Sequence, residues 1–234
     1  MIERAREDPR CVAAALLGSG ARQTEDEWSD IDLALRLAHD ADLDETMDDW
    51  TEWFGSEVTI SDRLDVHAWG AVYRVFFCDL PLQIDLSLWP WERFRSVRGE
   101  PMRVMFGDSL EPDDAPRPDW TQLARMGWLH ALHARSAIHR GRVLQADLML
   151  SIWRDQITSL VALRHGRNPS QARDAHLLPA EVQEAIGGAR PSDLERDELL
   201  RSLARTADLY LAEVREHDPE YADRLRGAID KLAQ

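Results

Sequence analysis

Two aspartates separated by one residue are the feature of this chain with the clearest chemical content. They stand in the run 30–35 (DIDLAL). Side chains of a β-strand alternate between its faces, so the branched aliphatic residues of this run face a core. Asp30 and Asp32 then share the other face, roughly 7 Å apart at their Cα atoms. Neighbouring carboxylates repel each other, and aspartate disfavours strands, so the pair destabilises the strand unless a cation such as Mg²⁺ neutralises it.

A third aspartate lies in a similar run. Residues 82–88 (LQIDLSL) place four aliphatic side chains on one face and Asp85 at the centre of the other. If the two strands are neighbours, three carboxylates converge and suit two Mg²⁺ ions about 3.5–4 Å apart, as in phosphoryl and nucleotidyl transfer. Asp85 could also accept the proton of an attacking hydroxyl. The alternative is a solvated edge strand for Asp30 and Asp32, with Asp85 as an outward polar residue.

A glycine-rich triplet, Gly18-Ser19-Gly20, precedes the paired aspartates. Without β-carbons, its backbone amides can approach a ligand closely, and the Ser19 hydroxyl can donate, as in loops that hold phosphate oxygens. Alone, the triplet is typical of an ordinary turn. Its occurrence together with all three aspartates favours a metal and phosphate site, because no rule of core packing or turn formation requires the whole set.

This combination of a strand ending in Gly-Ser, the sequence SDIDL at 29–33 and a later acidic strand resembles the DNA polymerase β superfamily of nucleotidyltransferases. Within it, the chain is most similar to the aminoglycoside and lincosamide (antibiotic) nucleotidyltransferase group. The resemblance implies ATP as the nucleotide donor, with its β- and γ-phosphates on Gly18 and Ser19. Arg22 and Ser29 complete the implied nucleotide site.

The resemblance also implies the roles of the acidic residues. Asp30 and Asp32 would each bind both Mg²⁺ ions. Asp85 would bind one ion, either as a ligand only or also as the general base. All three are therefore candidate catalytic residues.

The apolar pattern changes near residue 112. Before it, short β-branched and aromatic runs alternate with turns; after it, helical periodicity dominates. We therefore predict an α+β fold, with an N-terminal nucleotidyltransferase mixed sheet with helices at 1–111, a proline-rich linker at 112–118 and an all-α helical bundle at 119–234. The predicted strands are 11–17, 31–36, 71–78, 82–88 and 102–106, with a hairpin turn at 79–81. The predicted helices are 42–54, ending at Gly55, then 119–141, 143–166, 179–187, 193–216 and 218–232.

The predicted helix 143–166 carries a polar stripe of Asp147, Ser151, Arg154 and Thr158, with Asp155 beside it. A water-facing stripe with a helix salt bridge is one interpretation. The other is a pocket wall, in which Asp147 or Asp155 binds an acceptor and Arg154 binds phosphate.

Histidines and tryptophans offer weaker candidates. His130 and His133 have helical spacing, but no further ligand is spaced to complete a zinc site, so we expect solvated or packed side chains. Trp89 and Trp91 flank Pro90 after the Asp85 strand. Packing of a domain interface is favoured over stacking of one of them on the adenine or sugar of a nucleotide. Cys11 and Cys78 lie in apolar runs and are expected to be buried thiols.

The composition restricts the partners. Of 234 residues, 28 are basic and 43 acidic, for a net charge of −15, and Lys231 is the single lysine. This charge disfavours nucleic acid and anionic membranes, and it favours a cationic small molecule. No apolar segment is long enough for a signal peptide or a membrane span, so a cytoplasmic location is expected.

The sequence therefore predicts a magnesium-dependent enzyme of the nucleotidyltransferase class. It would transfer AMP from ATP to a hydroxyl of a small molecule, expected to be an aminoglycoside- or lincosamide-like antibiotic, and release pyrophosphate. One alternative is transfer to a protein or tRNA, as in toxin–antitoxin systems. Another is a nucleotide-binding module without catalysis.

Overall fold

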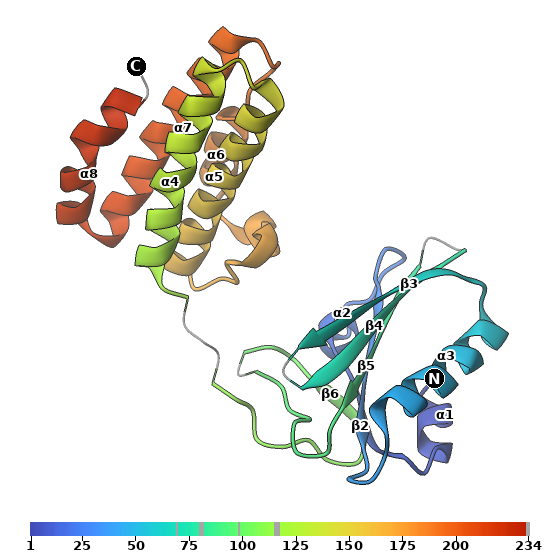
Figure 1. Cartoon of the computed structure of the whole chain (residues 1–234). Helices are drawn as coiled ribbons and strands as arrows, with labels where there is room; N and C mark the ends of the chain where they lie inside the picture. Colours follow the sequence, from blue (N-terminus) through green and yellow to red (C-terminus); the bar gives the residue numbers. More distant parts are fainter. Residues whose placement is uncertain (69, 80–81, 98, 115–117, 233–234) are drawn as a thin grey trace. The chain divides into compact units, whose positions relative to one another are not determined.

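The computed structural model describes residues 1–68, 70–79, 82–97, 99–114 and 118–232. The chain divides into two compact units, Met1–Pro116 and Arg117–Gln234, which we call the sheet unit and the helical unit. In Figure 1 the sheet unit runs from blue to green and the helical unit from green-yellow to red. The division falls inside the segment 112–118 that we predict as a linker.

Six strands form the sheet unit, in the order β3-β4-β5-β2-β1-β6. β2 and β5 are parallel, and every other neighbouring pair is antiparallel. The sheet is therefore mixed, as predicted. The strands are β1 (Cys11–Leu16), β2 (Ile31–Leu37), β3 (Ile60–Ala68), β4 (Ala71–Cys78), β5 (Gln83–Trp89) and β6 (Arg103–Phe106).

One face of the sheet packs against two helices. The aliphatic residues of β2 and β5 form a core with buried side chains of α1 (Ile2–Glu7) and α3 (Leu43–Glu57). Both helices lie on the same side of the sheet (Figure 1). Asp42 caps α3 by accepting a hydrogen bond from the backbone N–H of Glu45 at 2.9 Å.

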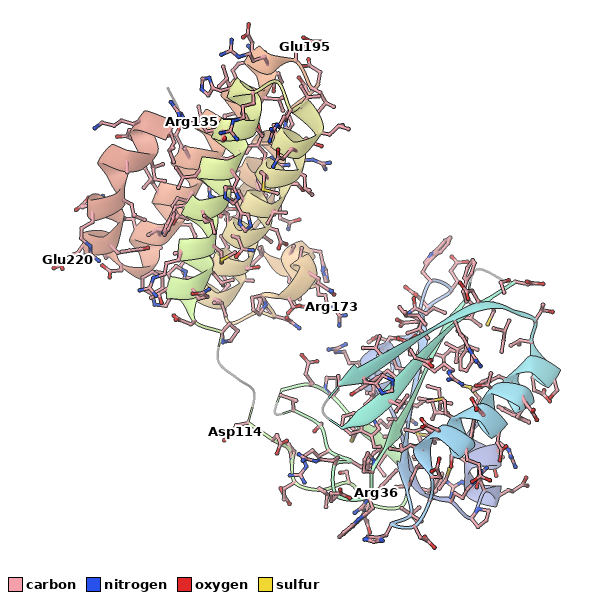
Figure 2. All side chains as sticks on the ribbon, in the orientation of Figure 1. Arg36, Asp114, Arg135, Arg173, Glu195 and Glu220 are labelled. Carbon is pink, nitrogen blue, oxygen red and sulfur yellow. The ribbon has the colours of Figure 1, made fainter. Side chains whose placement is uncertain are left out.

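The other face packs against the connection between β5 and β6, through Phe94 and Met102. Buried alanines of β1, β2 and β4 form a small core there with Trp89 and Phe94. Arg36, labelled in Figure 2, links β2 to the segments before and after β6. Its guanidinium donates to the backbone carbonyl of Trp91 at 2.7 Å and to that of Asp108 at 3.1 Å.

The helical unit contains a bundle, as predicted. Tyr210 and Trp153 are fully buried with ring centroids 5.7 Å apart, and the Tyr210 hydroxyl donates to the carbonyl of Ala124 at 2.6 Å. No helix among the described residues is long and apolar enough to cross a bilayer. The helices are α4 (Trp120–His139), α5 (Val143–Arg164), α6 (Ala180–Gly188), α7 (Arg196–His217) and α8 (Pro219–Leu232), with 3₁₀ turns at Ser170–Ala172 and Ala175–Leu177.

The structure corrects three details. Helix α3 does not end at Gly55 but continues to Glu57, where the N–H of Val58 bonds to the carbonyl of Phe54 at 2.9 Å. Strand β3 and helix α1 were not predicted. The antiparallel pairing of β4 with β5 confirms the predicted hairpin, although residues 80–81 of its turn lie outside the described residues.

Candidate functional site

Strands β2 and β5 bring the three predicted carboxylates together. Asp32 lies directly opposite Asp85 in the parallel register, and Asp30 immediately precedes β2. One carboxylate oxygen from each aspartate lies within 4.8 Å of the others. The prediction that the two aspartate strands are neighbours is confirmed. The edge-strand alternative is wrong, because β2 lies between β5 and β1.

Asp85 is partly buried, and its surroundings perturb the balance between its charged and neutral forms. Desolvation raises the pKa of its carboxyl, hydrogen bonding from Gln83 opposes this, and the negative charge of Asp30 adds to it. The side-chain amide of Gln83 donates to the two carboxylate oxygens at 2.9 and 3.1 Å. The sequence predicts no role for Gln83. Its position two residues before Asp85 on the same strand, however, places both side chains on one face and indicates a contact between them.

Gly18 lies directly against Asp32. Its φ of 51° is in the left-handed region, and a Cβ at this position would overlap Oδ2 of Asp32. The backbone N–H of Leu17 donates to the carbonyl of Asp32 at 3.0 Å, which holds the loop to β2. Glycine is therefore needed here both for the backbone conformation and for the position of the carboxylate.

Ser19, in the short helix α2 (Gly18–Arg22), has an unpaired hydroxyl. Its Oγ is shielded from solvent and has no hydrogen-bond partner in the described part of the chain. Leaving a buried hydroxyl unpaired costs about 1–3 kcal/mol, and a ligand oxygen would satisfy it. Next to three carboxylates, this donor fits a magnesium–phosphate ligand, because the carboxylates match the cation and the hydroxyl matches the phosphate.

Two further predicted nucleotide-binding residues make contacts within the protein. Arg22 pairs with Glu100 at 3.7 Å, with both side chains about half exposed (52% and 55%). Ser29 closes a turn with Asp26: its hydroxyl accepts from the Asp26 N–H at 3.0 Å and donates to the Asp26 carboxylate at 2.9 Å. This turn leads into Asp30. The nucleotide-binding roles of Arg22 and Ser29 stay predictions.

The predicted substrate-binding residues Asp147, Arg154 and Asp155 all lie on α5 of the helical unit, whereas the triad belongs to the sheet unit. Arg154 is only 7% exposed, and its Nη1 atom is buried without a hydrogen-bond partner. Burial lowers the pKa of Arg154, Asp147 opposes this, and the charge of Arg190 adds to it. Burial also raises the pKa of Asp155.

These observations change the interpretation of the α5 stripe. A water-facing stripe is wrong for Arg154 and Thr158, because both are buried and the Thr158 hydroxyl donates to the Arg154 carbonyl at 2.9 Å. Binding of phosphate by Arg154, and of an acceptor by Asp147 or Asp155, stays a prediction.

The aromatic and cysteine predictions have simpler outcomes. Trp89 is buried and makes edge-to-face contacts with Tyr73 and Phe94 of the sheet unit, at centroid distances of 5.7 and 6.5 Å, whereas Trp91 is exposed. A domain-interface role for either tryptophan stays a prediction. Cys11 and Cys78 are free, buried thiols, as predicted.

No protein-family model and no curated protein matches the sequence. The solved structures that are similar to it include the following two. An aminoglycoside 6-adenyltransferase from Bacillus subtilis is 14% identical, with 99% of this chain and 95% of that chain covered and a TM-score of 0.45. A nucleotidyltransferase-like protein from Exiguobacterium sibiricum is 13% identical, with 97% and 77% covered and a TM-score of 0.38.

Proposed function

We propose that this protein is a magnesium-dependent nucleotidyltransferase that transfers AMP from ATP to a hydroxyl of a small molecule. The observation that carries the proposal is the position of Asp30, Asp32 and Asp85 within 4.8 Å of one another, on the sheet face beside Gly18 and Ser19. Three oxygen ligands next to a loop with an unpaired hydroxyl suit a metal-bound triphosphate better than a free metal ion.

Each residue has a definite task in this reaction. Asp30 and Asp32 would hold both Mg²⁺ ions and Asp85 one of them; the bound ions would neutralise the charge that develops on the α-phosphate and on the leaving oxygen. Gly18 and Ser19 would hold the β- and γ-phosphates. The acceptor oxygen forms a bond to the α-phosphorus, the bond from that phosphorus to the bridging oxygen breaks, and pyrophosphate leaves.

Asp85 is the best placed proton acceptor. It lies opposite Asp32 on β5, on the side of Asp32 away from β1 and Gly18, where the attacking hydroxyl would approach. The Gln83 amide fixes the orientation of that carboxylate through its two hydrogen bonds. The proton of the attacking hydroxyl would therefore pass to an oxygen of Asp85.

The proposed acceptor is a cationic small molecule of the aminoglycoside or lincosamide type, which would make the protein an antibiotic resistance enzyme. The net charge of −15 supports a cationic acceptor. On α5, Asp147 and Asp155 supply carboxylates for it, and Arg154 supplies a buried guanidinium for phosphate. A cytoplasmic location is part of the same proposal, because ATP and Mg²⁺ are both abundant there.

The substitutions Asp30→Asn, Asp32→Asn and Asp85→Asn test the proposal. Each removes one negative ligand at nearly constant volume, so we expect pyrophosphate release from ATP and Mg²⁺, measured across a panel of aminoglycosides and lincosamides, to fall by about a hundredfold or more. Asp108→Asn, an exposed aspartate outside the triad, is the matched control and should keep wild-type turnover. Undiminished turnover in the triad variants would contradict the proposal.

A further inference from the structure

A cavity of about 360 Å³ lies entirely within the sheet unit. Tyr73 on β4 and Trp89 on β5 form its aromatic walls, and Leu17, Val97 and Met102 line it from the loops. Asp114, labelled in Figure 2, is also among its lining residues. The sequence alone does not predict this cavity, because its walls come from four segments that are separate in the chain.

The cavity opens on the same face of the sheet as the carboxylates. The side chains of Ile84, Leu86 and Leu88 belong to the core under α1 and α3, so Asp85 and Trp89 point to the opposite face. Tyr73 lies opposite Ser87 in the pairing of β4 with β5. Ser87 is two residues after Asp85, so it lies about 7 Å further along β5. The cavity therefore begins beside the triad and continues along the strands.

Its lining has the chemistry of a site for a flat heterocycle. The walls are mainly apolar and aromatic, and the edge-to-face contact of Tyr73 with Trp89 holds both rings in place. Donors and acceptors also line the cavity, from Arg93, Arg95, Ser96, Glu100, Asp113 and Asp114, and Arg95 donates to the Asp113 carboxylate at 3.2 Å. A small apolar pocket with a few polar groups at this volume suits a single small-molecule moiety.

The direction in which the cavity extends from the triad indicates which substrate it binds, the donor nucleotide or the acceptor molecule. Gly18 follows β1, and β2 lies between β1 and β5, so the phosphate loop and Asp85 flank Asp32 on opposite sides. In the proposed reaction the attacking and leaving oxygens are in line, and that line crosses the strands from the Asp85 side to the Gly18 side. The ribose oxygen on the α-phosphorus is one of three oxygens in the plane perpendicular to this line. That plane contains the strand direction, in which the cavity extends, so the nucleoside can reach the cavity from the triad.

We infer that this cavity binds the base and ribose of the donor nucleotide, with Tyr73 and Trp89 as the walls that contact the base. The inference rests on the proposed nucleotidyl transfer. It makes the sheet unit the main determinant of nucleotide affinity, and it leaves the acceptor to approach from the Asp85 side of the triad.

The test separates nucleoside binding from phosphate binding. Val97→Trp fills the cavity from a side chain that is 37% exposed, and Val104→Trp on β6, 38% exposed and outside the cavity, is the matched control. Calorimetry is performed with two probes and Mg²⁺: α,β-methylene-ATP, and inorganic tripolyphosphate, which has no nucleoside.

We expect Val97→Trp to weaken binding of the ATP analogue by about tenfold or more, as for loss of base stacking, and to leave tripolyphosphate binding within about twofold. Val104→Trp should change neither. Tyr73→Leu, which removes an aromatic wall without adding volume, should reproduce the selective loss, so the result does not depend on one variant.

Three outcomes overturn the inference. Unchanged affinity of Val97→Trp and Tyr73→Leu for the ATP analogue excludes the cavity as the nucleoside site, and a raised KM for the acceptor alone would then assign it to the acceptor. An equal loss for both probes means that the variants disturb the phosphate loop. If the wild-type protein binds neither probe, the proposed function itself fails, which is a distinct result from the first two.

Discussion

Asp32 is the residue on which most constraints of the site converge. Asp85 faces it from the neighbouring strand, Asp30 lies two residues before it, just ahead of β2, and Gly18 lies against its carboxylate oxygen. Its carbonyl also accepts the hydrogen bond from Leu17 that ends β1. A substitution at Gly18 therefore displaces the Asp32 carboxylate, a candidate metal ligand, although Asp32 itself is unchanged.

Gly18→Ala tests this arrangement. The new methyl group would displace the Asp32 carboxylate, so we expect Mg²⁺-dependent turnover to fall by at least about tenfold, and the strained left-handed backbone to cost about 1–2 kcal/mol of stability. Gly141→Ala is the control, because Gly141 also has a left-handed φ, of 66°, but open space around it. Turnover at different Mg²⁺ concentrations and thermal unfolding measure both effects. Equal turnover in the two variants would contradict the role of Gly18.

Among the secondary-structure elements, strands and helices were predicted correctly where one buried face makes apolar residues recur at a regular spacing. The aliphatic alternation in β2 and β5 and the 3.6-residue period of α4, α5 and α7 follow from a core on one side. Strand β3 was missed because it is an edge strand whose residues 61–67 are all exposed, so its sequence is not selected by a core. Helix α1 is short and buries only Ala5.

The candidate site was predictable to the same extent. The three aspartates could be found, because their alternation with aliphatic residues shows which face they occupy. The parallel register that sets Asp32 opposite Asp85 could not, because strand order depends on long-range pairing. The nucleoside cavity was equally hidden, since Tyr73 and Val97 meet only after the connection between β5 and β6 packs on the sheet.

Two helical glycines give opposite predictions for one substitution. Gly227 is exposed in α8 and a Cβ would meet nothing within 4 Å, so Gly227→Ala should stabilise the helical unit by about 0.5–1 kcal/mol. Gly127 in α4 lies against the ring of Tyr210, where a Cβ would come within 2.6 Å of Cε2. Gly127→Ala should therefore destabilise the unit by about 1–3 kcal/mol. Denaturant unfolding measures both; destabilisation by Gly227→Ala would contradict the first.

At the scale of the whole molecule, the net charge of −15 and the triad act on different ligands. The overall charge repels polyanions at long range, whereas the clustered carboxylates attract Mg²⁺ and, through it, a triphosphate. Because Lys231 is the single lysine, we expect arginine side chains, hydroxyl groups and backbone amides to make the direct protein contacts to phosphate. In the sheet unit, Oγ of Ser19 is a buried donor without a partner in the described residues, which a phosphate oxygen would satisfy.

Each unit has its own core, because no hydrophobic cluster of the described residues draws members from both. Leu86→Ala in β5 and Leu203→Ala in α7 each create a cavity at a fully buried side chain and should cost about 2–5 kcal/mol. By hydrogen exchange, we expect Leu86→Ala to lower protection in the strands and Leu203→Ala to lower it in α5 and α7. Leu144→Ala, at a side chain 74% exposed, should change stability by less than about 0.5 kcal/mol. A uniform loss of protection over both units from either core variant would show that the whole chain unfolds as one cooperative body.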